Sequence, residues 1–197
     1  MSEYEAERAR ILKRYAITPQ GEAGQGSTNL TTEGGVYKPL SVQEIQKQEG
    51  IYFSQAAQNE LQAAQNAYYK GNMTAAEYTA LETRVVEGEA AKQFASNISV
   101  VTEKYSLNEN GYFGDKGKNC RVIKCSDPVT VSAEFYEIIS RGGKEIALPN
   151  GKGVQTVFAD NTRIVYRIYT STEGSPAIEI RVIGGTVKQQ KIHFIIE

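Results

Sequence analysis

The chain has 197 residues, of which 40% are hydrophobic and 23% charged, and its formal net charge is −1. This composition is ordinary for a soluble globular protein, and the length allows one large domain or two small ones. No apolar run reaches the roughly 18 residues that a membrane-spanning helix needs. The charged segment from Met1 to Arg14 lacks an apolar signal-peptide core, so we expect no classical export signal in this chain.

Charge is unevenly distributed along the sequence. From Gly114 onward there are 12 Lys and Arg against 9 Asp and Glu, a net charge of +3, whereas the preceding part has a net charge of −4. A basic end joined to an acidic beginning suits a domain that binds a polyanion. A charge of +3 over this length is also common in proteins that bind none.

Two cysteines, Cys120 and Cys125, have the spacing C-x4-C. A closed zinc site needs about four nitrogen or sulfur ligands, and the only histidine, His193, is 68 residues further on. The sequence therefore predicts no metal site and no cofactor. A local disulfide and a pair of free thiols both remain open.

Three S/T-x-x-E capping boxes mark helix starts in the first half of the chain. They predict helices from Ser2 to about Tyr15, from Ser41 to about Tyr69 and from Thr74 to about Asn97. A stretch near residues 17–40, rich in Gly, Ser, Thr and Asn, is typical of a linker. Residues 1–105 are thus expected to form a helical region that includes an antiparallel helical hairpin.

The last part of the chain changes character. Asp127-Pro128 is an N-cap followed by proline at the first helical position, and Gly142-Gly143 ends the predicted helix. Runs typical of β-strands follow, separated by turn residues: Lys144 to Pro149, Val154 to Phe158, Thr162 to Thr170, Ala177 to Ile183 and Gln190 to Ile196. The sequence therefore predicts an α+β fold, with one main helix packed on an antiparallel sheet of roughly four or five strands in residues 106–197.

Side chains alternate between the two faces of a strand, so sequence parity separates those faces. In the last three strands one parity is apolar and is expected to pack on the helix: Ile164, Tyr166, Ile168, Ile178, Ile180, Val182, Ile192, Phe194 and Ile196. Every charged residue of these strands, and the only histidine, has the opposite parity. A solvated sheet face would also be polar, but the gathering of arginines around His193 favours a site.

Cleavage of RNA through its own 2′-hydroxyl needs a base, an acid and cations that stabilise the phosphorane. His193, with an ordinary pKa of about 6.5, can serve as acid or base, and Glu179 is the complementary base. Arg163, Arg167 and Arg181 can hold the phosphate. No metal is required for this chemistry, which predicts a metal-independent ribonuclease.

Weaker candidates for substrate binding are Lys191, Lys144, Thr156 and Ser175. Thr156 is included because it could point to the polar face. Ser175 lies in a Gly-Ser-Pro triplet, where turn chemistry explains it at least as well as phosphate binding.

Three segments carry a resemblance to a known family: Asp160 to Arg167, Glu173 to Ile180 and Gln190 to Phe194. They resemble the C-terminal toxin regions of bacterial polymorphic toxins, including the CdiA-type proteins of contact-dependent growth inhibition. Within that group, the last 85 or so residues are similar to ribonucleases of the barnase, colicin D and RelE type of fold.

The resemblance implies an endoribonuclease that cleaves tRNA, with His193 as the catalytic imidazole and Glu179 and the arginines around it. It also implies a cognate immunity protein and, in some members, a requirement for elongation factor Tu with or without its exchange factor. Such a toxin would be exported as part of a larger cell-surface protein and would act in the cytoplasm of the target bacterium. The preceding helical region would serve entry into that cell or partner docking.

Two other functions remain open. A non-enzymatic module could use the basic sheet face to bind a protein or a nucleic acid, and it would not depend on His193. A nuclease directed at DNA would normally use a metal ion, for which the sequence offers no ligand cluster.

Overall fold

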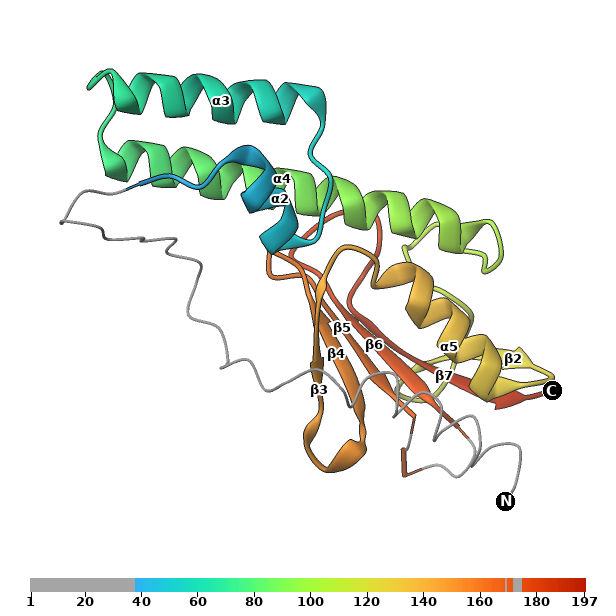
Figure 1. The fold of residues 1–197 in the computed structure, drawn as a ribbon. Coiled ribbons are helices and arrows are strands. Elements are labelled where there is room, and N and C mark those ends of the chain that lie inside the picture. Colours follow the sequence, from blue (N-terminus) through green and yellow to red (C-terminus); the bar gives the residue numbers. More distant parts are fainter. Residues whose placement is uncertain (1–37, 169, 172–174) are drawn as a thin grey trace.

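The computed structural model describes residues 38–168, 170–171 and 175–197. Two layers are visible in Figure 1: a helical layer formed by α2, α3 and α4, and below it a sheet with α5 on one of its faces. The expected helix from Ser2 to Tyr15 and nearly all of the expected linker lie outside the described residues. No helix in the described part of the chain is long and apolar enough to cross a membrane.

The helix expected from Ser41 to Tyr69 is two helices, α2 (Val42–Glu49) and α3 (Gln55–Tyr69). Gly50 ends α2 in the left-handed conformation, with a φ of 71°, and Ser54 caps the start of α3 by accepting from the backbone N–H of Ala57. The prediction of one helix was wrong because a left-handed glycine ends a helix even where helix-favouring residues continue on both sides.

The long helix α4 (Ala75–Thr102) joins the helical layer to the sheet layer. Its first half packs against α3 in the expected antiparallel hairpin (Figure 1). Its second half packs against α5: the Asn97 side chain donates to the carbonyls of Ile139 at 3.1 Å and Arg141 at 2.8 Å. Phe94 contacts Phe158 edge to face, with ring centroids 5.5 Å apart.

One apolar core therefore runs from α2 and α3 through α4 to α5 and the sheet. It crosses residue 105, where the sequence suggested a division into two domains. That division remains a prediction.

Helix α5 (Pro128–Ile139) begins and ends as expected. The Asp127 side chain accepts from the backbone N–H of Thr130 at 3.1 Å, and Pro128 occupies the first turn, where its missing N–H costs nothing. Phe135 and Ile138 of this helix are buried.

The sheet has seven strands in the order β1-β2-β7-β6-β5-β4-β3. The five expected strands are confirmed as the antiparallel run β3 (Lys144–Ala147), β4 (Gly153–Val157), β5 (Arg163–Arg167), β6 (Ala177–Arg181) and β7 (Gln190–Ile196). Two further strands were not expected: β1 (Asp115–Lys116) and β2 (Arg121–Cys125). Strand β2 is parallel to β7, so no local hairpin signal marks it.

Both cysteines lie at this added edge, and both are free thiols in the structure. Burial raises the pKa of the Cys125 thiol above its ordinary value.

The two faces of the sheet differ as strand parity indicated. Ile164, Ile178 and Ile192 are fully buried on the face that α5 covers. On the same face, Phe135 of α5 packs edge to face on Phe194, with centroids 5.6 Å apart. This layer of apolar contacts holds the strands rigidly, so side chains on the opposite face project from a fixed frame.

Candidate functional site on the open sheet face

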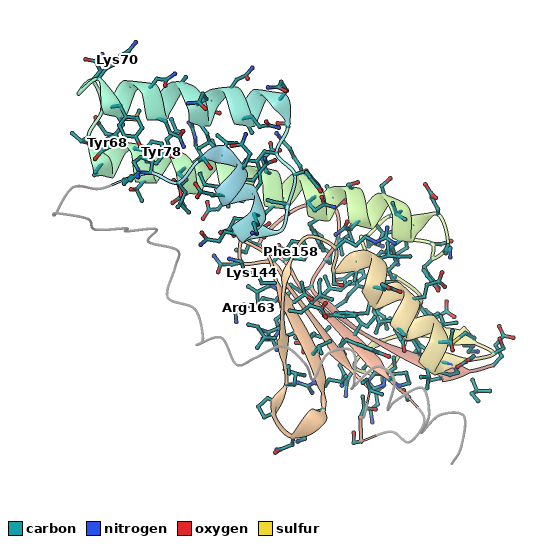
Figure 2. All side chains as sticks on the ribbon, in the orientation of Figure 1. Tyr68, Lys70, Tyr78, Lys144, Phe158 and Arg163 are labelled. Atoms are coloured by element: carbon teal, nitrogen blue, oxygen red, sulfur yellow. The ribbon has the colours of Figure 1, made fainter. Side chains whose placement is uncertain are left out.

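Cross-strand partners point to the same side of a sheet, so the strand register identifies the residues opposite α5. We call this side the open face. In β3 to β7 its members are Lys144, Ile146, Gly153, Gln155, Val157, Arg163, Val165, Arg167, Ala177, Glu179, Arg181, Lys191, His193 and Ile195. These five strands thus present five cationic side chains and one carboxylate there. Figure 2 shows Lys144 and Arg163 projecting on this side, away from α5.

The register also sorts the side chains of the open face into rows that cross the strands. His193 is opposite Ala177, and Ala177 is opposite Arg167; we call these three residues the histidine row. Arg163 is opposite both Arg181 and Val157; we call Arg181, Arg163 and Val157 the arginine row. The arginines expected to surround His193 in one site thus belong to two rows.

A third row lies between these two. It contains Lys191, Glu179, Val165 and Gln155 in successive strands. Val165 is only 4% exposed and gives this row a buried apolar centre.

The side chain of His193 has a partner that the sequence did not suggest. The Oγ atom of Ser175 and the Nδ1 atom of His193 are 2.8 Å apart and form a hydrogen bond. Ser175 is 3% exposed, and its carbonyl accepts from Thr170 Oγ1 at 2.6 Å. Among the described residues, Ser175 is the only hydrogen-bond partner of the imidazole, which it holds in one orientation.

Two effects keep the imidazole neutral at physiological pH. Burial lowers the pKa of His193 below its ordinary value of 6.5, and the positive charge of Lys191 lowers it further. Lys191 lies two residues away on the same strand and face. A neutral imidazole beside cations is a proton acceptor in a position that attracts an anion.

Glu179 and Arg181 form an ion pair. Glu179 Oε1 accepts from Arg181 Nε at 2.8 Å and lies equally close to Nη2. This hydrogen bond raises the pKa of Arg181. The carboxylate expected to work as a base is therefore turned toward the arginine row.

Two of the weaker candidates have structural contacts. Thr156 is fully buried on the face that α5 covers, where its hydroxyl hydrogen-bonds the Tyr136 hydroxyl at 2.5 Å. The suggestion that it points to the polar face was wrong, because its cross-strand partner Ile164 belongs to the apolar parity. Lys144 is on the open face, but its ammonium pairs with Glu49 at 3.2 Å and ties β3 to the end of α2.

Arg163 and Arg167 are exposed. Neither forms an ion pair with a carboxylate of the described residues. They are therefore the two arginines of this face whose guanidinium groups can turn to an external anion.

Sequence parity contained the signal for the Ser175–His193 contact. Ala177 is on the open face, opposite His193. Ser175 precedes Ala177 by two residues, so the alternation of side chains along β6 places Ser175 on the same face. The Gly-Ser-Pro sequence around Ser175 is also typical of a turn, so the signal was not recognised from the sequence. Among the described residues there is no group of three or more His, Cys, Asp or Glu that could hold a metal ion.

The fold and the site thus define an α+β protein with a basic sheet face built around a neutral, hydrogen-bonded histidine. Comparisons with protein-family models, curated proteins and solved structures found no match.

Proposed function

We propose that the open face binds RNA and cleaves it without a metal ion, with His193 as the general base. The observation that carries the proposal is the Ser175–His193 hydrogen bond, which fixes a neutral imidazole on a face dominated by cations. An exposed histidine on a solvated sheet face needs neither a buried serine partner nor cationic neighbours.

In the proposed reaction, Nδ1–H of His193 donates to Ser175 Oγ, and the lone pair of Nε2 takes the proton of the ribose 2′-hydroxyl. The 2′-oxygen then forms a bond to phosphorus as the bond to the 5′-oxygen breaks. The products are a 2′,3′-cyclic phosphate and a free 5′-hydroxyl. Because the nucleophile belongs to the substrate, this chemistry needs only proton transfer and charge stabilisation.

Two cations near His193 have defined roles in this proposal. Arg167, in the histidine row, stabilises the negative charge that develops on the phosphorane, as a guanidinium can do through two parallel hydrogen bonds. Lys191, two residues before His193 on β7, donates the proton that the leaving 5′-oxygen needs. The imidazolium of His193 then releases its proton to solvent, and the amine of Lys191 takes one from solvent, so both groups return to their starting states.

tRNA is the substrate we propose, and a toxin delivered into a bacterial competitor is the proposed context. The support for both is the resemblance of the strand segments around Arg163, Ser175 and His193 to polymorphic toxin ribonucleases. A cognate immunity protein and a requirement for elongation factor Tu belong to the same proposal. The net basic charge from Gly114 onward suits a polyanionic substrate.

The test is incubation of the purified protein with total bacterial RNA in the presence of EDTA, with and without cytosolic extract, followed by probing of tRNA on a denaturing gel. We expect discrete tRNA fragments from the wild type and none from His193→Gln. Gln62→Ala changes an exposed polar side chain of α3 and should leave the fragments unchanged.

Cleavage that appears only with extract would indicate a host factor. Intact RNA in every lane would contradict the nuclease and favour a binding module on the same face. Such a module would bind RNA or protein equally well with His193→Gln, and it would weaken with Arg163→Ala.

A further inference from the structure

We propose that the arginine row is a second phosphate subsite, which binds a phosphate at least two nucleotides away from the one that reacts at His193. This inference rests on the proposed RNA substrate. It makes the protein an enzyme for extended RNA strands, and it removes Arg163 and Arg181 from the reacting centre.

The two rows lie far apart along the strands. Arg163 and Arg167 are on the same face of β5 and four residues apart, which separates their Cα atoms by ~13 Å at about 3.4 Å per residue. Arg181 is separated in the same way from Ala177, the residue opposite His193. This distance is longer than that between adjacent phosphates of one nucleic-acid strand, so the two rows suit phosphates that are not neighbours.

The charges within the arginine row also favour a bound phosphate. Arg163 and Arg181 are directly opposite each other, and like charges in that position destabilise a sheet. Glu179 neutralises and orients Arg181, whereas Arg163 has no carboxylate partner among the described residues. A phosphate at Arg163 would supply the counter-charge that this guanidinium lacks and would accept hydrogen bonds from it, whereas Glu179 already holds Arg181.

The surface between the rows also suits a bound strand. Its centre is the buried Val165, with Gln155 beside it and the fixed Glu179 on the other side. An RNA strand that runs along β5 would pass over this low apolar centre and would keep its phosphates near the cations at either end. Proteins that bind single strands commonly follow the strand's backbone with cationic side chains.

The effect of Arg163→Ala should depend on the length of the RNA substrate. A dinucleotide with the cleaved bond at His193 cannot reach the arginine row, whereas a ten-nucleotide strand can occupy both rows. Arg163→Ala should therefore raise KM for the longer strand by about tenfold, the loss of one charge-assisted contact, and should leave the dinucleotide unaffected. Arg167→Ala should impair both substrates through kcat.

The experiment measures kcat and KM for the two RNA lengths with the wild type, Arg163→Ala, Arg167→Ala and the charge-matched control Lys188→Ala, whose exposed side chain lies outside the strands. In parallel, anisotropy measures the affinity for 2′-deoxy versions of both lengths, which cannot be cleaved. All substituted side chains are exposed, so the variants should fold as the wild type does.

Equal effects of Arg163→Ala on both lengths, or no effect on either, would overturn the second subsite. The wild type could bind the longer strand more tightly than the dinucleotide, lose this difference in Arg163→Ala and yet cleave neither RNA. That result would support the subsite and contradict the proposed catalysis. Failure of the wild type to bind either deoxy strand would contradict the subsite directly.

Discussion

Ser175 and His193 lie 18 positions apart in the sequence, and their side chains meet through a hydrogen bond of 2.8 Å. Ser175 is almost completely buried just before β6, and His193 is half-buried on β7. A buried hydroxyl that holds one imidazole nitrogen fixes both the ring orientation and the nitrogen that faces solvent. The same principle orients histidines in catalytic sites, where the partner of one nitrogen determines the role of the other.

Replacement of Ser175 by alanine should lower kcat by about tenfold with little change in KM, because the base remains present but loses its orientation. Nitrogen-15 NMR of the imidazole should show the mixed tautomers of a free histidine in place of one dominant form. Ser171→Ala, which changes an exposed serine nearby, is the matched control. An unchanged tautomer in Ser175→Ala would show that the hydrogen bond does not position the ring.

The pH dependence of cleavage should report the depressed pKa of His193. Because the base must be neutral, activity is present above this pKa and is lost as pH falls through it. Burial and Lys191 lower the pKa below 6.5, so the acidic limb of kcat/KM should have its midpoint below pH 6.5. Lys191→Gln removes one of the two causes and should move the midpoint of the imidazole titration upward. This titration is followed by NMR, because Lys191 is also the proposed acid and its loss should itself lower activity. A midpoint of the wild-type acidic limb that differs from that of the imidazole would mean that another group titrates.

Glu179→Gln separates the two candidate bases. The Glu179 carboxylate pairs with Arg181 at 2.8 Å, so its loss should free Arg181 and change kcat by less than about tenfold. The loss of a true general base costs about 100-fold or more, as expected for His193→Gln. A loss in Glu179→Gln as large as that in His193→Gln would assign the proton transfer to Glu179 instead.

The junction of α4 and α5 should be critical for stability. Asn97 is 3% exposed and donates to two backbone carbonyls at the end of α5. Asn97→Ala leaves these carbonyls without that donor and should lower the free energy of unfolding by about 1–3 kcal/mol. Gln62→Ala on the exposed side of α3 is the control and should have little effect in the same urea titration.

The same titration tests how the helical region and the sheet are divided. Because one apolar core extends from α2 to the sheet, helical circular dichroism and tyrosine fluorescence should change in a single coincident transition. Two separated transitions would support independent domains on either side of residue 105.

Some helices and strands were predicted from the sequence, and others were missed. Capping boxes and proline placement located α4 and α5, because a helix start depends on residues three or four positions apart. The break between α2 and α3 was missed because the Gln- and Ala-rich stretches on either side of residues 50–54 favour helices and conceal the short break. Strand β2 was missed because its partner β7 is some 70 residues further on. Parallel strands are not joined by a short turn, so the sequence contains no hairpin signal for this pair.

The sequence alone determined the five-strand antiparallel run and the composition of its two faces, because alternation along a strand is a local property. It placed His193, Glu179 and the arginines on one face. Only the tertiary structure decided how these residues are grouped, because cross-strand register depends on contacts between distant segments. Register placed Arg163 and Arg181 in a row separate from His193, turned Thr156 toward α5 and brought Ser175 to the imidazole.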